Sequence, residues 1–542
     1  MDKNPSKNNL ERSVSPESVG IDSRAIIDFF NECEAENIEL HSFMLLRHGK
    51  VAVQAWWAPF NPQTPHTMFS FSKSVVGTAI GFAIDEGKVS LSTNVYGLFP
   101  EYALKRKKKY EDVLNVEHLL TMTSGKASSI LINTEKVGWV KSFLRAPFKD
   151  TPGENFEYVT GNSFMLAAII KKITGQSVVD YLTPRLFEPL GIDIPFWEKN
   201  QSGIEVGGWG LYFKTEDQAK FVQCYLDNGK WKGKQVIPED WAKTVGQQHV
   251  EETPGVSADH AEGYGYQFWL NSLPNSYRCD GLFSQFGIVM KDQDACIVTT
   301  AGEPLEDKVL EIIWRHFPKG FSEQSLPENP DLLAKLQQKT AGLSLPTLPE
   351  FQSKEGPDKV KVTEREKEIS GKFIKFRLPG LATVLGMVDN AFSTKRSGGF
   401  NNVQMTFEKN CLKFFWTEKY DENTIDIGYN GKNIVSKGIV AGRAYDFAAS
   451  CAWHEDGSLE IWIRPLQLAQ MKKLLFTFDG ENVKMAITTE KGLYDLALFG
   501  LDFKGIEADD LIFRLAKGAA SVAEPIVEPD LNGKFFEQIS EE

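Results

Sequence analysis

The first three hundred or so residues alternate between strand and helix patterns. Ser42–Arg47 and Val51–Trp57 are rich in β-branched and aromatic residues and flank His48-Gly49-Lys50, which predicts an antiparallel hairpin. The apolar stretches Ser74–Glu86 and Gly161–Ile173 each run toward a glycine and predict helices. Further strands are predicted at Tyr266–Trp269, Gly287–Met290 and Ala295–Thr300, and a closing helix at Leu305–Arg315.

The pattern changes near Pro318. A polar stretch with one short helical pattern, Asp331–Lys339, contains Pro327, Pro330, Pro346, Pro349 and Pro357. Such a stretch is typical of a linker, which we expect to pack against the surface. After Glu368 the pattern is almost wholly β, at Val403–Phe407, Leu412–Thr417, Thr424–Tyr429, Leu459–Ile463, Leu474–Phe478 and Val483–Thr488. With hairpin turns at Asp456-Gly457 and Asp479-Gly480, these short strands predict a small barrel or sandwich.

These changes divide the chain into five parts. We expect a polar N-terminal tail at 1–18, an α+β domain at 19–320, a Pro-rich linker with a short helix at 321–368, a β-barrel-like domain at 369–525 and an acidic tail at 526–542. At about 150 residues per domain, the length of 542 residues indicates two or three domains.

Composition excludes several classes of protein. With 42% hydrophobic and 25% charged residues, the chain does not have the composition of a globally disordered protein. Its 60 basic and 73 acidic side chains give a net charge of −13, which disfavours binding to nucleic acid or to an anionic membrane. Its six cysteines form no CxxC pair and no zinc-ligand spacing, so we expect no metal. Residues 1–18 lack the apolar region of a secretory signal, and the longest apolar run, Val75–Ile84, is too short to span a bilayer. We therefore expect a cytoplasmic protein with free thiols.

The sharpest chemical feature is Ser70 three residues before Lys73, where the helix begins. This spacing places the two side chains on one helical face, where a lysine with a depressed pKa can activate the serine as a nucleophile. The unpaired N–H groups of the helix start also offer a donor to an oxyanion. The alternative is a chance Ser-x-x-Lys spacing, although no second instance occurs in the chain.

Tyr158 is the second candidate. It follows Pro152-Gly153 on the loop before the helix that begins near Gly161, from where its phenol could relay a proton between Lys73, Ser70 and a leaving group. The alternative is a core tyrosine with a satisfied hydroxyl.

Together these residues resemble the serine β-lactamase-like family, which includes class C β-lactamases, penicillin-binding proteins and related esterases, amidases and D-aminopeptidases. Supporting stretches run in family order from about Ser15 to Pro318, at His118–Gly125, Leu166–Gly175, Leu186–Gly191, Gly207–Leu211, Leu226–Lys234 and Gly263–Trp269. The resemblance implies an antiparallel sheet flanked by helices with a helical subdomain, and no cofactor. It also implies that Ser70 is acylated, that Lys73 is its base and that Tyr158 shares the proton transfer.

The resemblance also implies an oxyanion hole formed by the N–H of Ser70 and a second donor. That donor comes from a strand with a Lys-Thr-Gly-like triplet, which we match to Tyr277–Gln285 running into Phe286–Met290. Cys279, Asp280 and Gly281 then occupy the triplet, and the donor lies at or next to Leu282.

The departures from the family pattern concern the substrate. Lys-Thr-Gly and Ser-Asp-Asn are absent, and Tyr158 is followed by Val-Thr rather than by x-Asn, with Asn162 close by. Cys279 cannot attract a substrate carboxylate as the family's lysine does, and Asp280 would repel it, with only Arg278 nearby to compensate. We therefore expect weak β-lactamase activity and a neutral or cationic ester or amide as the substrate.

Other candidates carry less weight. Trp209 and Tyr212 could line the acyl pocket or pack on the helical subdomain, whereas His48, His66 and His118 are not spaced for a triad. Our hypothesis is a serine hydrolase of the esterase/amidase type that acts on a small-molecule substrate. The alternatives are an acyltransferase that uses the same acyl-enzyme, and a non-catalytic penicillin-binding-like sensor. The role of the β-domain and homo-oligomerisation stay open.

Overall fold

The computed structural model describes residues 9–102, 109–126, 138–251, 253, 258–348, 362–376, 383–395, 397–419, 421–492 and 528–536. The described chain forms two compact units. The first comprises the residues up to Trp56 together with Pro65–Leu343, and the second comprises Trp57–Thr64 and the described residues from Ser344 onward. Among the described residues, no helix combines the length and the apolar character needed to cross a bilayer.

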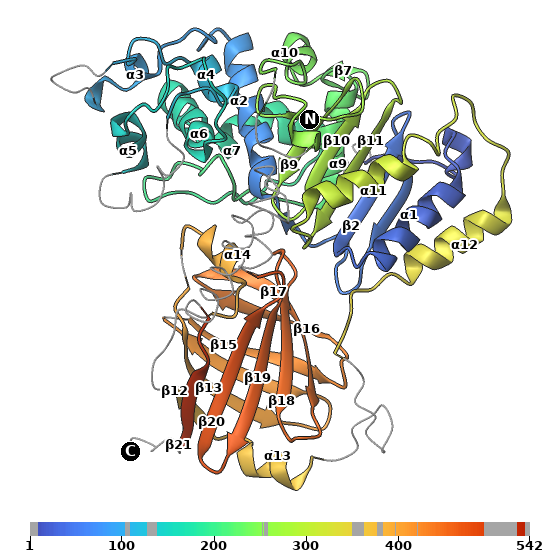
Figure 1. The fold of residues 1–542 in the computed structure, drawn as a ribbon, viewed down its shortest axis with the longest axis vertical. Helices are drawn as coiled ribbons and strands as arrows, with labels where there is room; N and C mark the ends of the chain where they lie inside the picture. The colour runs from blue at the N-terminus through green and yellow to red at the C-terminus, as the bar shows by residue number, and fades with distance from the viewer. Residues whose placement is uncertain are drawn as a thin grey trace, which may run out of the picture. The chain divides into compact units, whose positions relative to one another are not determined.

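The first unit is built on a sheet with the strand order β1-β3-β2-β11-β10-β9-β8, of which β2, β11, β10 and β9 are labelled in Figure 1. Its strands are β1 (Glu11–Arg12), β2 (Leu40–Arg47), β3 (Lys50–Trp56), β8 (Trp269–Leu270), β9 (Ser276–Gly281), β10 (Gln285–Met290) and β11 (Ala295–Ala301). Neighbouring strands are antiparallel, except that β1 runs parallel to β3. Two small ribbons pair β4 (His66–Thr67) with β5 (Tyr212–Phe213) and β6 (Lys230–Trp231) with β7 (Lys234–Gln235).

Helices cover both faces of this sheet. On one face lie α1 (Ser23–Ala35) and α11 (Glu306–His316), and the rings of Phe29 in α1 and Phe43 in β2 are 4.9 Å apart. On the other face lies α9 (Thr215–Leu226), where the Thr215 hydroxyl donates to Ser42 Oγ over 2.8 Å. Because Ser42 and Phe43 are adjacent in β2, their side chains face opposite sides of the sheet.

The remaining helices include the expected helical subdomain. They are η2 (Glu17–Val19), η3 (Phe69–Phe71), α2 (Ser72–Asp85), α3 (Val95–Leu98), η4 (Pro100–Tyr102), α4 (Val116–Leu120), α5 (Trp139–Arg145), α6 (Thr160–Thr174), α7 (Val178–Leu182), η5 (Thr183–Phe187), α8 (Glu188–Leu190), α10 (Glu239–Thr244), η6 (Ala258–His260) and α12 (Pro330–Ala341).

Helix α2 carries apolar residues around its circumference, as expected for a helix that is buried on all sides. It packs against α6 and α7 of the helical subdomain and against β9 of the sheet. Gly81 allows α2 to approach Trp241 of α10 closely, since a Cβ atom there would lie 2.4 Å from the ring of Trp241. Because α2 is apolar and has small residues at its contacts, it can pack between the sheet and the helical subdomain. Its first turn therefore lies at the junction of these two parts.

The second unit is a closed β-barrel, not a sandwich. Its elements are β12 (Phe373–Phe376), β13 (Phe400–Phe407), β14 (Leu412–Glu418), β15 (Asp421–Tyr429), β16 (Ile434–Val440), β17 (Arg443–Trp453), β18 (Leu459–Pro465), β19 (Lys472–Asp479), β20 (Asn482–Thr489), β21 (Leu531–Phe536), α13 (Glu364–Ile369) and α14 (Met387–Ala391). The sheet order runs β15-β14-β13-β12-β21-β20-β19-β18-β17-β16, and a parallel pairing of β15 with β17 closes a ring of nine described strands. The predicted fold class is confirmed in both units.

Several local predictions were wrong. Tyr266–Trp269 forms a strand only from Trp269, because Gln267 takes φ of 65° and its side-chain amide donates to the carbonyl of Leu120 over 2.9 Å. Tyr277–Gln285 is not one strand, since β9 ends at Gly281 and a turn with positive φ at Phe283 and Ser284 leads into β10.

The chain ends also differ from the predicted tails. Glu11 and Arg12, which we assigned to a polar tail, form β1, and Leu10 is buried. Residues Leu531–Phe536, assigned to an acidic tail, form β21 between β12 and β20. Short strands inside polar segments carry too few apolar positions to be recognised from the pattern alone.

Candidate active site

Ser70 lies in a one-turn 3-10 helix, η3, directly before α2. The turn is held by the N–H of Met68, which donates to Leu211 O over 2.9 Å, and by the N–H of Phe71, which donates to Met68 O over 3.0 Å. Phe69 takes a left-handed φ of 40°, an uncommon conformation for a bulky residue. This constrained turn presents the half-buried Ser70 side chain at the N-terminus of a buried helix.

Lys73 contacts Ser70 as the spacing predicts. Lys73 Nζ donates to Ser70 Oγ over 2.7 Å and to the carbonyl O of Gly208 over 2.8 Å. Only 1% of Lys73 is exposed, and burial lowers the pKa of its amine to about 7 although the charge of Asp280 acts to raise it. A large share of the molecules therefore carries a free amine beside the hydroxyl at neutral pH.

Tyr158 completes the group of three. Lys73 Nζ lies 4.8 Å from the centre of the Tyr158 ring, which packs on the ring of Trp269 at 5.4 Å. Burial raises the pKa of the Tyr158 phenol, and hydrogen bonds with Ser70 and Trp269 only partly offset this effect. At neutral pH the phenol therefore keeps its proton and can donate it.

The end of β9 lies against the turn that holds Ser70. A Cβ atom at Gly281 would lie 2.3 Å from Met68 O and 3.1 Å from the backbone N of Phe71, so only glycine allows this approach. The backbone at Gly281 and Leu282 is thereby brought beside η3. The role of this backbone as the second oxyanion donor stays a prediction.

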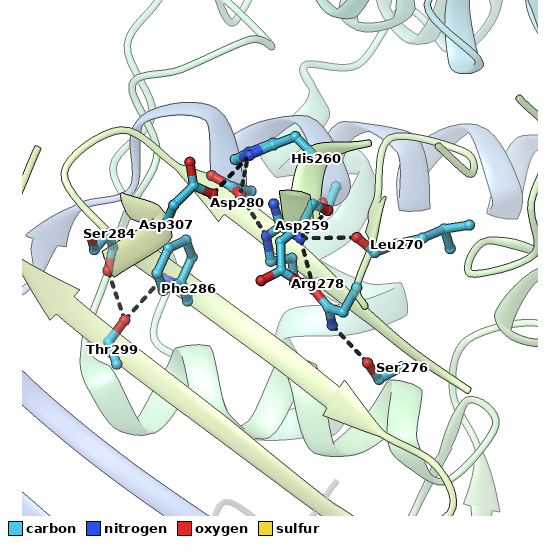
Figure 2. Close-up of polar contacts among 12 residues, drawn as sticks. Asp259, His260, Leu270, Ser276, Arg278, Asp280, Ser284, Phe286, Thr299 and Asp307 are labelled. Carbon is cyan, nitrogen blue, oxygen red and sulfur yellow. Dashed lines mark hydrogen bonds and ion pairs between the residues drawn. The ribbon is translucent and has the colours of Figure 1, made fainter. Parts of the chain in front are cut away.

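The charge of Asp280 is compensated more completely than the sequence indicated. Arg278 Nε donates to Asp280 Oδ2 over 2.7 Å, and His260 Nε2 lies 3.3 Å from the same oxygen (Figure 2). The three side chains are buried. Sequence reasoning missed His260, because it lies in the short helix η6 and nothing in its local spacing indicates a contact with β9.

His260, Asp280 and Glu306 place possible ligand atoms within 4.8 Å of one another. The guanidinium of Arg278, 2.7 Å from Asp280 Oδ2, opposes a cation at this point. Burial and the charges of Asp280 and Asp307 raise the pKa of Glu306 well above its ordinary range, which disfavours the carboxylate form that a metal ion would require. We therefore describe the cluster as an ion-pair network and assign no metal to it.

The other pocket candidates serve mainly in packing. The rings of Trp209 and Trp139 pack at a tilt with their centres 5.7 Å apart, and Tyr212 in β5 is buried. Asn162 is fully buried, and its Oδ1 has no hydrogen-bond partner among the described residues. The thiol of Cys279 is buried, and burial raises its pKa, so it stays protonated.

Gly208 is a second residue whose role the sequence did not indicate, although its surroundings explain it. A Cβ atom there would lie 2.3 Å from Cγ2 of Thr160, so the segment approaches α6 closely and presents its carbonyl to Lys73. Two of the histidines considered from the sequence have structural contacts: His118 Nδ1 accepts from the N–H of Asn115, the N-cap of α4, over 3.3 Å, and His48 Nδ1 lies 2.8 Å from Asp294 Oδ2.

Comparison with known proteins identifies a family and several similar chains. The Beta-lactamase family model matches residues 34–310. The chain is 26% identical over 248 residues to 6-aminohexanoate-dimer hydrolase of Paenarthrobacter ureafaciens, covering 42% of this chain and 63% of that protein. It is 25% identical over 315 residues to Protein flp of Staphylococcus aureus (strain MRSA252), covering 52% of this chain and 63% of that protein. The match thus spans less than two thirds of the length of either relative.

Among solved structures, a penicillin-binding protein homolog from Caulobacter crescentus matches with a TM-score of 0.45 and 16% identity, over 54% of this chain and 97% of that one. The family match covers just over half of the 542 residues and includes Ser70, Lys73, Tyr158 and all of β9 and β10. The chain belongs to the Beta-lactamase family.

Proposed function

We propose that this chain is a serine hydrolase that cleaves a small ester or amide through an acyl-enzyme. The observation that carries the proposal is the 2.7 Å contact between the buried amine of Lys73 and Ser70 Oγ. A serine hydroxyl is a weak nucleophile unless a base lies within hydrogen-bond reach, and a lysine is such a base only when its amine is free. The name of the relative 6-aminohexanoate-dimer hydrolase supports hydrolysis as the reaction.

In the acylation step, Ser70 Oγ attacks the substrate carbonyl while its proton passes to Lys73. The carbonyl carbon forms a bond to Ser70 Oγ and loses its bond to the leaving alcohol or amine, which takes a proton from Tyr158. Lys73 then returns its proton to Tyr158, whose ring lies 4.8 Å from the amine. The N–H of Ser70, with the backbone near Leu282, would stabilise the oxyanion.

In the second step, water attacks the acyl carbon and gives up a proton to Lys73. The bond between the carbonyl carbon and Ser70 Oγ breaks, the acid leaves, and Lys73 passes the proton it took from water to Ser70 Oγ, which restores both groups. An alcohol or amine in place of water would make the reaction an acyl transfer. The residues that form the acyl-enzyme do not determine whether water, an alcohol or an amine receives the acyl group. The assay must therefore identify this acceptor.

The substrate class follows from the charges beside Ser70. Asp280 is paired with Arg278 and His260, so its carboxylate offers little attraction to a cation and little repulsion to an anion. Cys279 is a buried neutral thiol in the place where a lysine would attract a carboxylate. These features favour an uncharged acyl group, which narrows the neutral or cationic class expected from the sequence.

The proposal is tested by labelling with a fluorophosphonate probe, followed by intact-mass and peptide analysis. We expect one phosphonyl adduct on Ser70, none in Ser70→Ala, and much slower labelling in Lys73→Ala. Ser72→Ala is the matched control, since Ser72 lies two residues further along and its Oγ accepts a hydrogen bond from the N–H of Leu211 over 3.2 Å. A protein that never labels on Ser70 and hydrolyses no p-nitrophenyl ester would instead support a sensor.

A further inference from the structure

Asp280 places a buried negative charge close to the reacting groups. Its carboxylate acts to raise the pKa of both Lys73 and Tyr158, against the effect that burial has on the lysine. A buried carboxylate without a partner would favour the ammonium form of Lys73, and an ammonium ion cannot accept the serine proton. The chain therefore needs a means of cancelling this charge.

Arg278 supplies the first cancelling charge. Arg278 and Asp280 are two residues apart in β9, so both side chains lie on the same face of the strand. Arg278 Nε donates to Asp280 Oδ2, while Nη1 donates to Asn271 Oδ1 over 2.7 Å and to the carbonyl of Leu270 over 3.0 Å. These contacts, of which those with Asp280 and Leu270 can be followed in Figure 2, fix the fully buried guanidinium against the carboxylate.

His260 is the second side chain that compensates the charge of Asp280. Its Nε2 lies 3.3 Å from Asp280 Oδ2, and its Nδ1 lies 3.4 Å from Asp307 Oδ1 on α11. Burial and the charge of Arg278 act to lower the pKa of His260, but its contacts with Asp280 and Asp307 raise it overall. The ring also packs edge-on against Trp269 at 4.6 Å, and Trp269 packs on Tyr158.

Other charged and titratable groups also surround Asp280. On α11, Asp307 faces His260, and burial raises the pKa of Glu306 well above its ordinary range. On η6, Asp259 Oδ1 accepts from the N–H of Ser272 and Oδ2 accepts from Trp314 Nε1. The remaining neighbours in the field of Asp280 are the thiol of Cys279 and the phenols of Tyr158 and Tyr264.

We propose that Arg278 and His260 are positioning residues that neutralise Asp280 and so keep the amine of Lys73 free to act as the base. This inference rests on the proposed function, because it assumes that Lys73 accepts the proton of Ser70. Neither residue touches the reacting atoms in this account. Both act through the charge that Lys73 experiences.

The test follows the rate of fluorophosphonate labelling at Ser70 from pH 5 to pH 10 and records the midpoint of its acid limb. In Arg278→Gln, Asp280 loses its main partner, and we expect the midpoint to move to higher pH by about one unit. In Asp280→Asn, Arg278 is left uncompensated, and we expect a shift of similar size to lower pH. In the double variant no charge remains in the pair, and we expect the wild-type midpoint.

Two further variants guard against misfolding and against general effects of losing a charge. A single member of a buried pair can be too costly to leave alone. His260→Asn is the milder change, and we expect a smaller shift in the direction of Arg278→Gln. Arg185→Gln is the matched control, because Arg185 pairs with Glu86 and with nothing in this network. We expect its midpoint to equal that of the wild type.

The outcomes separate this inference from the proposed function. If the wild-type protein does not label at Ser70 at any pH, the proposed function fails. If it labels, but the folded variants share one midpoint or Arg278→Gln and Asp280→Asn shift it in the same direction, the inference is overturned while the proposed function stands. Opposite shifts that cancel in the double variant support it, because a purely structural role would slow labelling without this reversal of sign.

Discussion

The amine of Lys73 lies 2.7 Å from Ser70 Oγ and 2.8 Å from the carbonyl oxygen of Gly208. Both acceptors are fixed by backbone: Ser70 by the turn η3, and Gly208 by its close approach to Thr160. Neither acceptor carries a negative charge, so the contacts position the amine without holding it as an ammonium ion.

Replacing Lys73 by arginine removes the free base while keeping a long cationic side chain. A guanidinium does not lose its proton in proteins, so we expect Ser70 labelling and ester hydrolysis to fall by about 10²- to 10⁴-fold. Progress curves with p-nitrophenyl acetate measure the loss. If Lys73→Arg or Lys73→Ala kept the wild-type rates, another group would have to take the proton of Ser70.

The rate of acylation is expected to depend on pH through Lys73. The pKa of its amine is lowered to about 7, so the fraction of free amine, and with it the rate, rises as the pH passes from 6 to 8. The rate of Ser70 labelling across this range is the measurement. A rate that rises only above pH 10, where an exposed lysine loses its proton, would show that the pKa of the Lys73 amine is not lowered.

The buried amine is also expected to reduce stability. The unfolded chain binds a proton at Lys73 up to about pH 10.5, whereas the folded chain releases it near pH 7. Between these two pH values the unfolded state binds more protons than the folded state. The free energy of unfolding therefore increases as the pH rises, and the destabilisation caused by the buried amine becomes smaller. We expect Lys73→Met to raise the melting temperature at pH 7 by about 2 °C or more, and by less at pH 10. An equal gain at both values would contradict this coupling to the proton.

Gly281→Ala tests the approach of β9 to the nucleophile. Its Cβ atom would meet Met68 O at 2.3 Å, so the strand must move away from η3. A displacement of about 1 Å in such a site can cost about 100-fold in rate, and we expect a loss of this order in Ser70 labelling. Gly342→Ala is the matched control, since its Cβ atom would lie 3.4 Å from the nearest atom. Equal labelling in both variants would remove Gly281 from the account.

Substrate charge is expected to matter in a particular way. Since Cys279 is a buried neutral thiol and Asp280 is paired, we expect uncharged p-nitrophenyl esters to be cleaved at least about 10-fold faster than their hemisuccinate counterparts. For the same reason we expect nitrocefin, which carries a carboxylate, to be a poor substrate. Robust nitrocefin hydrolysis would show that an anion is bound by residues other than those of the β9 triplet.

Local signals predicted most of this arrangement. The i, i+3 spacing placed Lys73 beside Ser70 because a helix begins there, and apolar runs ending at glycine gave α2 and α6 to within two residues. The Gln267 turn and the break at Gly281 were not predicted, since each depends on contacts with distant backbone: Leu120 in one case and Met68 in the other. His260 was missed for the same reason, because its partners lie on β9 and α11.

The most direct test of the central claim is to mix the protein with p-nitrophenyl acetate, quench with acid after milliseconds, and measure both the nitrophenol released and the intact mass. The account predicts a burst of about one nitrophenol per chain and a matching acetyl group, mapped by peptide analysis to Ser70 and absent from Ser70→Ala. Nitrophenol release with no acyl adduct at any quench time, at a rate that Ser70→Ala preserves, would contradict it.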